Sequence, residues 1–217
     1  SRMVDMIMAR VFGHDIVEDL ARHGSIPVIN GLSDFSHPCQ AVADYFTLYE
    51  RWSSLKGRKI AYVGDGNNVC HSLLYGAAIL GMHIAVGAPD GYKPEKRVVD
   101  FSTELAKKTG GSVTIVTDPK EAVKNADCVY TDVWASMGQE KEYLERKKVF
   151  GGYQVNKELF SLAKKDAVFL HCLPAHRGDE VTDDVIDSPN SAAWDEAENR
   201  LHCQKAIMLM LLGAEKF

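Results

Sequence analysis

The feature that most constrains this chain is a regular alternation of short apolar runs with helical patterns from residue 59 onward. The apolar runs have the length and β-branched content of buried strands, and the segments between them have helical periodicity. The predicted strands are 59–63, 82–86, 112–116, 128–131 and 167–170, and the predicted helices are 68–80, 94–109, 119–124, 139–148 and 196–212. Strands and helices that alternate in this way form βαβ units. The sequence therefore predicts an α/β fold with a doubly wound, Rossmann-like parallel sheet.

The first 33 residues predict a smaller part, the remnant of a second α/β domain. Its expected elements are a helix at 1–12, a helix at 15–23 that ends near Gly24 and a strand at 26–29, and a further helix is expected after it at 38–51. Ser36 is placed to cap the last helix, and Pro38 lies in the first turn, where a missing N–H costs no hydrogen bond. No signal peptide is evident, and the first residues resemble the middle of a helix, so we expect a piece of a longer protein.

Composition excludes several classes of function. The formal net charge of −5 over 217 residues gives no basic footprint for nucleic acid. No apolar run approaches membrane-spanning length, and residues 206–212 are too short for a span, so they predict a packed helix. We therefore expect neither a nucleic-acid partner nor a membrane partner.

The five cysteines are odd in number, scattered and without a CxxC pair. This pattern predicts free thiols in a reducing compartment, which we expect to be the cytoplasm, with the mitochondrial matrix as the alternative. Structural zinc needs four ligands in paired spacing. Neither the group His171, Cys172 and His176 nor the pair His202 and Cys203 is therefore expected to bind a metal.

A glycine-rich turn, Gly64-Asp65-Gly66-Asn67-Asn68, follows the first strand of the alternating region. It begins like a G-x-G-x-x-G dinucleotide fingerprint, but Val69 stands where the third glycine belongs, and the acidic residue expected after the next strand is missing. These two missing elements argue against the alternative hypothesis of an NAD-dependent oxidoreductase. The glycines still allow a ligand near backbone N–H groups, and Asn68 offers an amide to either end of a zwitterion. A tight turn without a ligand is the other interpretation.

Polar side chains also lie at the start of the 38–51 helix and after the 128–131 strand. His37 and Gln40 are three residues apart, so both can project from one side of the first turn and donate to one carbonyl oxygen, as in an oxyanion hole. Asp132 and Ser136 suit a ligand that carries an ammonium and a carboxylate. Simple helix capping and a solvated loop are the alternatives at these two places.

The tetrapeptide His171-Cys172-Leu173-Pro174 ends the last predicted strand, and parallel sheets bind ligands at the carboxyl ends of their strands. Cys172 is a candidate covalent nucleophile. Adjacent strand residues point to opposite faces, however, so His171 is badly placed to activate it. We therefore favour Cys172 as a ligand or an acid–base partner.

These loops together resemble the aspartate/ornithine transcarbamoylase family, and most closely its ornithine carbamoyltransferases. The resemblance rests on His-Pro-x-Gln from His37, Asp-x-x-x-Ser-Met-Gly from Asp132 and His-Cys-Leu-Pro from His171, and it covers essentially the whole chain. It implies transfer of the carbamoyl group of carbamoyl phosphate to the δ-amine of L-ornithine, which gives L-citrulline and phosphate in arginine biosynthesis. It also implies no metal or organic cofactor, and a homo-oligomer that is a trimer or a multiple of one.

The resemblance also implies roles for individual residues. The contacts to the carbamoyl group or its phosphate are matched by Arg10, His37 and Gln40, and a position near the same carbonyl is matched by Arg200. The ornithine ligands are matched by Asn68, Asp132, Ser136 and Met137. The loop over the δ-amine and the carbamoyl nitrogen is matched by Cys172 and Leu173. The implied catalytic set is Arg10, His37, Gln40, Asp132, Cys172 and Arg200. In this set a carboxylate and a thiolate would orient the amine and receive its proton. The arginines, His37 and Gln40 would stabilise the negative oxygen of the tetrahedral intermediate.

One element of the family is missing, because no Ser-x-Arg-Thr-Arg phosphate loop occurs in these 217 residues. The expected division is the tail of the carbamoyl phosphate domain at 1–33, the ornithine domain at 34–195 and a helix that packs back on the first domain at 196–217. The apolar face of that helix, with Ile207, Leu209 and Leu211, would lack part of its cover. We therefore expect this polypeptide alone to have little or no activity.

Two further functions stay open at this stage. One is a carbamoyltransferase for a modified acceptor, such as acetylated or succinylated ornithine. The other is a silent binding module or regulatory relative, against which the presence of Asp132, Ser136, Cys172 and Arg200 argues. The sequence also leaves open whether the role is anabolic or catabolic.

Overall fold

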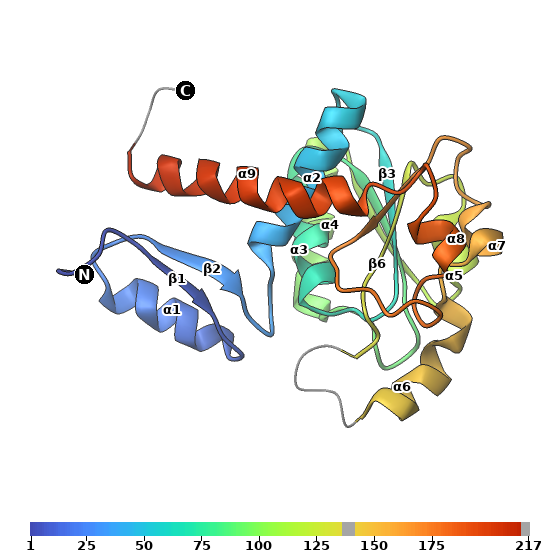
Figure 1. Cartoon of the computed structure of the whole chain (residues 1–217), viewed down its shortest axis with the longest axis horizontal. Helices are drawn as coiled ribbons and strands as arrows, with labels where there is room; N and C mark the ends of the chain where they lie inside the picture. Colours follow the sequence, from blue (N-terminus) through green and yellow to red (C-terminus); the bar gives the residue numbers. More distant parts are fainter. Residues whose placement is uncertain (136–141, 214–217) are drawn as a thin grey trace.

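The structure, a computed structural model, describes residues 1–135 and 142–213. Its main part is a parallel sheet that contains β3 and β6 (Figure 1). The strand order of this sheet is β5-β4-β3-β6-β7. The strands are β3 (Lys59–Val63), β4 (His83–Gly87), β5 (Ser112–Val116), β6 (Cys128–Thr131) and β7 (Val168–His171). The chain builds outward from β3 in one direction and then continues on its other side from β6. The predicted α/β class with a doubly wound parallel sheet is confirmed.

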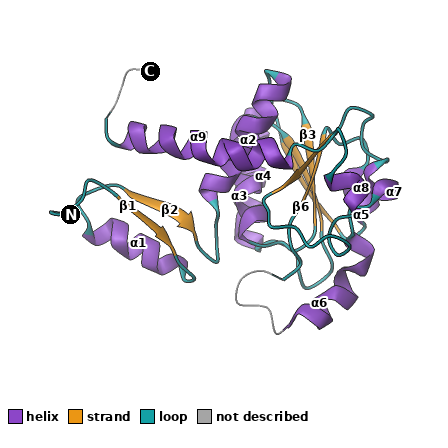
Figure 2. Ribbon diagram, viewed as in Figure 1, coloured by secondary structure: helices purple, strands orange, loops and turns teal. Residues whose placement is uncertain are grey.

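Helices cover both faces of this sheet (Figure 2). The helices on one face are α2 (Pro38–Trp52), α3 (Asn68–Leu80) and α4 (Lys96–Thr109); those on the other are α5 (Pro119–Val123), α6 (Tyr143–Phe150), α7 (Lys157–Phe160) and α8 (Asp183–Ile186). Strand β3 shows why both faces need cover: Ile60 and Tyr62 belong to the first core, whereas Ala61 and Val63 belong to the second. Successive strand side chains point to opposite faces, so a fully apolar strand requires two layers of helices.

A smaller parallel pair, β1 (Ile7–Arg10) and β2 (Val28–Leu32), is joined by α1 (His14–His23). The predicted helix at 1–12 is wrong, because Ile7 pairs with Val28 and the strand obtains its backbone hydrogen bonds from β2. A short apolar run does not distinguish a strand from a buried helix when its partner is distant in sequence. The predicted cap at Ser36 is also wrong: His37 is the N-cap residue of α2, and the Ser36 hydroxyl accepts from Asn30 Nδ2 at 2.9 Å.

The last helix, α9 (Ala193–Leu211), runs from the large sheet toward the smaller part (Figure 1). Its first half packs on α2 and β7 through Ala193, Glu196, Asn199 and Cys203, and its second half extends away from the sheet on the side of β1 and β2 (Figure 1). Leu209 and Leu211 are 40% and 44% exposed, whereas Ile207 is partly buried, so the predicted lack of cover is confirmed for two of the three residues named. Within the described ranges, no helix is both long enough and apolar enough to cross a membrane.

Candidate active site

A cleft of about 640 Å³ opens at the carboxyl ends of β3 and β6, where the strand order reverses. Open α/β sheets bind their ligands at such switch points. The cleft lies between the β1–β2 part and the large sheet. Its walls are formed by the start of α2, the β3–α3 turn, the loops after β6 and β7, and α9. The predicted site residues that line it are Arg10, His37, Gln40, Asn68, Asp132, Cys172, Leu173 and Arg200. The remaining two, Ser136 and Met137, lie outside the described residues.

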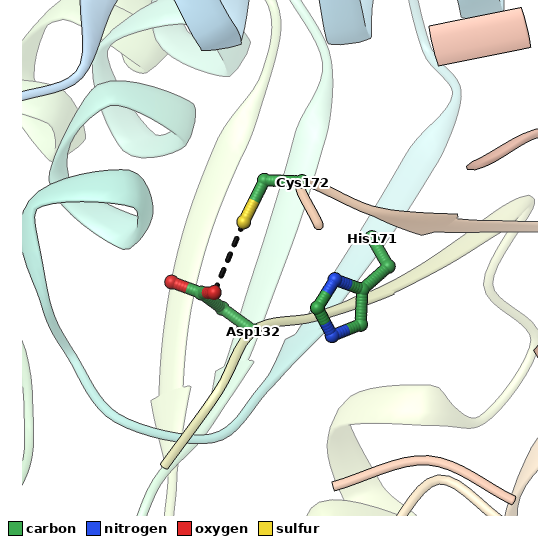
Figure 3. A group of neighbouring side chains, drawn as sticks. All are labelled: Asp132, His171 and Cys172. Atoms are coloured by element: carbon green, nitrogen blue, oxygen red, sulfur yellow. Dashed lines mark hydrogen bonds between the residues drawn. The ribbon is translucent and has the colours of Figure 1, made fainter. Parts of the chain in front are cut away.

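Asp132 and Cys172 form a hydrogen-bonded pair at the base of the cleft (Figure 3). The Cys172 thiol donates to Asp132 Oδ1 at 3.0 Å, and Asn67 Nδ2 donates to Asp132 Oδ2 at 2.7 Å. Burial and the adjacent Asp132 carboxylate raise the pKa of Cys172 well above its ordinary value. The predicted thiolate is therefore wrong, because low polarity and a neighbouring anion both favour the protonated thiol. Cys172 instead acts as a neutral donor that helps to hold the Asp132 carboxylate.

His171 lies beside this pair, but both of its ring nitrogens have other partners. Nδ1 accepts from the backbone N–H of Leu173 at 2.9 Å, so Nε2 carries the proton and donates to Glu180 Oε1 at 3.1 Å. This arrangement agrees with the prediction that His171 does not activate Cys172. The ligand atoms of Asp132, His171 and Cys172 do lie within 4.8 Å of one another, a spacing suited to a metal. A metal would need the Cys172 thiol to be deprotonated and His171 Nδ1 to be free, but the thiol donates to Asp132 and Nδ1 accepts from Leu173, so we assign no metal to the group.

His37 lies at the start of α2, where its ring is buried. Burial, reinforced by the positive charges of Arg200 and Arg10, lowers the pKa of His37 to about 3. The imidazole is therefore neutral at physiological pH and offers one donor and one acceptor. Its Nδ1 has no hydrogen-bond partner among the described residues. His37 thus remains available as a donor to a carbonyl oxygen in the cleft.

The side-chain amide of Gln40 is oriented with its oxygen toward the cleft, whereas the prediction required its nitrogen there. Its amide nitrogen donates to Asp44 Oδ1 at 2.8 Å and to Glu196 Oε1 at 2.9 Å, which uses both N–H bonds. Its oxygen accepts from Arg200 Nη1. The predicted role of Gln40 as a donor to a carbonyl oxygen is therefore wrong. The two buried carboxyl groups make it an acceptor toward the cleft.

The glycine-rich turn after β3 positions side chains rather than a dinucleotide. Asn67 caps α3 by accepting from Val69 N at 3.0 Å and Cys70 N at 3.1 Å, while its amide orients Asp132. Asn68 donates to the backbone oxygen of Ser33 at 2.6 Å and so ties α3 to the segment after β2. A Cβ on Gly66 would lie 2.1 Å from the nitrogen of Pro94. The space that a cofactor would need at this glycine is filled by the segment before α4.

Arg146 is a cleft residue that the sequence did not reveal. Its Nη1 donates to Asp65 Oδ2 at 2.7 Å and to the backbone oxygen of Trp134 at 2.9 Å, and both charged side chains are nearly buried. The residue belongs to the charged helix α6, which resembles a solvated surface helix in sequence. Only the packing of α6 on the turn after β3 identifies it as part of the cleft wall.

Comparison with known proteins matches both parts of the chain. Residues 56–211 match the family described as "Aspartate/ornithine carbamoyltransferase, Asp/Orn binding domain", and residues 1–50 match its "carbamoyl-P binding domain". The ornithine carbamoyltransferase of Pyrococcus horikoshii is 61% identical over 216 residues, which are 100% of this chain and 68% of that protein. The anabolic ornithine carbamoyltransferase of Pyrococcus furiosus is 58% identical over 217 residues, which are 100% of this chain and 69% of that protein.

The fold agrees with these sequence matches. A solved structure of the Pyrococcus furiosus ornithine carbamoyltransferase superimposes with a TM-score of 0.95 at 58% identity, over 99% of this chain and 69% of that one. Described residues of the three motifs on which the sequence resemblance rested line one cleft: His37, Gln40, Asp132, Cys172 and Leu173. Together, the two domain matches and the high identity show that this chain belongs to the aspartate/ornithine carbamoyltransferase family.

Proposed function

We propose that the protein carrying this chain is an ornithine carbamoyltransferase, which transfers the carbamoyl group of carbamoyl phosphate to the δ-amine of L-ornithine and releases L-citrulline and phosphate. The observation that carries the proposal is the cleft itself. It joins cationic groups and a neutral imidazole with a fixed carboxylate, in a family whose relatives carry this name. The name of the Pyrococcus furiosus relative includes "anabolic", which supports a role in arginine biosynthesis.

The electrophile needs charge stabilisation at its carbonyl oxygen. In the tetrahedral intermediate this oxygen becomes negative, and preorganised donors in a water-poor cleft stabilise it strongly. Arg10 and Arg200 supply positive charge, and neutral His37 supplies an N–H without requiring a proton from solvent. Gln40 is held with its oxygen available, which suits the N–H bonds of the carbamoyl group rather than its carbonyl oxygen.

The nucleophile must lose a proton before or during attack. An ammonium has no lone pair, so it must give up a proton before it attacks, and a carboxylate near the acceptor amine can orient the amine and accept that proton. Asp132 suits this task because Asn67 and Cys172 hold its two oxygens in place. The nitrogen–carbon bond forms, the carbon–oxygen bond to phosphate breaks, and the amine proton leaves with the phosphate. Ser136 and Met137 stay predicted ornithine ligands on the family resemblance.

Assembly, domain division and location complete the proposal. We propose a homotrimer in the cytoplasm, with residues 1–33 and 196–217 belonging to the carbamoyl phosphate side and 34–195 to the ornithine side. Exposed apolar side chains support association, since large apolar patches mark interfaces; Val42, Phe46, Tyr49 and Ile79 line one such groove on α2 and α3. Five free cysteines support a reducing compartment. Sedimentation analysis checks the trimer.

Citrulline formation from carbamoyl phosphate and L-ornithine tests the activity. Two proteins are compared: this chain, and a version extended upstream through a Ser-x-Arg-Thr-Arg phosphate loop, called the extended protein below. We expect robust turnover by the extended protein and little by the chain alone. N-acetyl-ornithine and N-succinyl-ornithine are the control acceptors. A folded extended protein that carbamoylates only a modified acceptor, or none, would refute the proposal.

A further inference from the structure

Two fully buried carboxyl groups meet behind the cleft, outside the catalytic set described above. Asp44 lies on α2 and Glu196 on α9, and both are 0% exposed. Both accept from the same nitrogen, Gln40 Nε2, at 2.8 and 2.9 Å, so the two groups are held close together. Tyr130 Oη at 3.2 Å and the backbone N–H of His171 at 3.0 Å also donate to Glu196. This buried carboxyl pair therefore links α2, α9 and the last two strands.

The pair requires a proton. Asp44 Oδ2 is buried and meets no donor in the described part of the chain, while Asp44 and Glu196 accept from one shared nitrogen. Two carboxylates so close in an apolar interior cannot both be ionised at low cost. Burial raises the pKa of Asp44 to about 6, and burial together with the Asp44 charge raises the pKa of Glu196 well above its usual range. The pair therefore keeps one proton at neutral pH, with Glu196 donating toward Asp44.

In the described part of the chain, Arg200 is the cation that acts on the pair, and it contacts the same Gln40 amide. The other titratable groups that face the pair are neutral at physiological pH, because burial raises the pKa of each; they are Tyr45 on α2, Cys128 and Tyr130 on β6, Cys172 after β7 and Cys203 on α9. A singly ionised pair thus balances Arg200.

We propose that Asp44 and Glu196 are positioning residues: the pair shares one proton and fixes the Gln40 amide with its nitrogen inward and its oxygen toward Arg200 and the cleft. An amide has two orientations that exchange donor for acceptor. The two carboxyl acceptors behind Gln40 allow only one of them. The inference rests on the proposed function, because the group so oriented is a substrate contact. Its physical basis is that a buried N–H without an acceptor is costly, which penalises the flipped amide.

Glu196→Gln is the informative change. Three donors converge on Glu196, and a glutamine amide has only one oxygen, so Gln40 loses a fixed acceptor. In the extended protein we expect kcat/KM for citrulline formation to fall about tenfold or more. Asp44→Asn is the conservative partner, because its oxygen still accepts from Gln40 and its N–H takes the place of the shared proton. Its loss should be smaller than that of Glu196→Gln.

Two controls separate positioning from general damage. Glu198→Gln changes the same residue type two positions along α9, where the side chain is exposed, and should leave kcat/KM unchanged. In a Gln40→Ala background, Glu196→Gln should cost no more than about twofold, since residues that act through one group are not additive. Circular dichroism and thermal unfolding establish that each variant is folded.

An infrared readout tests the shared proton without any turnover. Wild-type protein at neutral pH should show the carbonyl stretch of a protonated carboxyl group, and Glu196→Gln should abolish it. Absence of this band in the wild type overturns the proposal. So does an equal loss from Glu196→Gln with and without Gln40, or a larger loss in Asp44→Asn than in Glu196→Gln. An extended protein that shows the band but makes no citrulline refutes the proposed function instead.

Discussion

Asn67 is the most informative residue of the cleft to substitute, because its side chain has two roles that one substitution can separate. Its oxygen caps α3 by accepting from two backbone N–H groups, and its nitrogen donates to Asp132 Oδ2 at 2.7 Å. Asn67→Asp keeps the capping oxygen and places a second carboxylate oxygen where the donor nitrogen was. Negative charge at a helix N-terminus is favourable, so the helix itself keeps its start.

The magnitude follows from the 2.7 Å separation of the two side chains. Two unit charges at that distance repel by about 1.5 kcal/mol at the dielectric constant of water and by about 6 kcal/mol at an effective value of about 20. Each 1.36 kcal/mol corresponds to about one pH unit. Both groups lie partly or fully within the protein, so we expect the new carboxylate pair of the variant to hold a proton up to a pH about two units higher than a single carboxylate would. The acidic limb of the rate profile then moves to higher pH.

The assay is the pH dependence of kcat/KM for citrulline formation by the extended protein, with urea unfolding in parallel. The matched control is Asn156→Asp, since Asn156 also caps a helix, by accepting from Leu159 N at 2.9 Å, and does not line the cleft. Asn67→Asp should shift the acidic limb while Asn156→Asp does not. Superimposable profiles for wild type and Asn67→Asp would refute the reasoning that Asn67 orients an ionised Asp132.

Three further outcomes are expected from the same cleft. His37 has a pKa of about 3 in the folded protein, against about 6.5 in the unfolded chain. Its contribution to the free energy of unfolding is therefore complete above pH 6.5 and declines as the pH falls toward 3. The midpoint of urea unfolding should fall over this pH range, and His37→Gln should reduce that fall. The raised pKa of Cys172 predicts slow alkylation of its thiol by iodoacetamide at neutral pH, and Asp132→Asn should accelerate this alkylation. Mass spectrometry follows the labelling, and rapid labelling of the wild-type thiol would contradict the assignment of Cys172 as a neutral hydrogen-bond donor. Arg146→Met leaves Asp65 buried without its partner and should lower the free energy of unfolding by about 3 kcal/mol, while Asp65→Asn in the same chain should restore part of it; equal losses in the single and double variants would argue against this ion pair.

Several elements of the fold were predictable because their signals are local. Helix α3 has the predicted bounds, 68–80, and the strands at 59–63, 112–116 and 128–131 are also as predicted. Each of these segments has a local periodicity or β-branched content and is bounded by turn residues, so its conformation can be read without knowing which distant segment covers it. Residues 7–10 failed for the opposite reason, because their conformation depends on pairing with residues 28–32.

The site divides in the same way. The motifs predicted that His37, Asp132 and Cys172 lie together, because each follows a strand or opens a helix, whereas Arg10 was predicted only from the family resemblance. The protonation states of these side chains were not predictable from the sequence. Whether a thiol is ionised depends on the desolvation and charge around it, and the buried Asp132 contact decides this for Cys172.

The sequence by itself determined the fold class and the approximate membership of the cleft, since periodicity, turn residues and motif order are properties of short segments. Only the tertiary structure decided the polarity of Gln40, the ion pair of Arg146 and the proton shared by Asp44 and Glu196. These features depend on residues that are far apart in the chain: Gln40 and Glu196 are separated by 156 positions. Hydrogen-bond direction and protonation are set by the groups that meet in space, and no local pattern of residues encodes which groups those are.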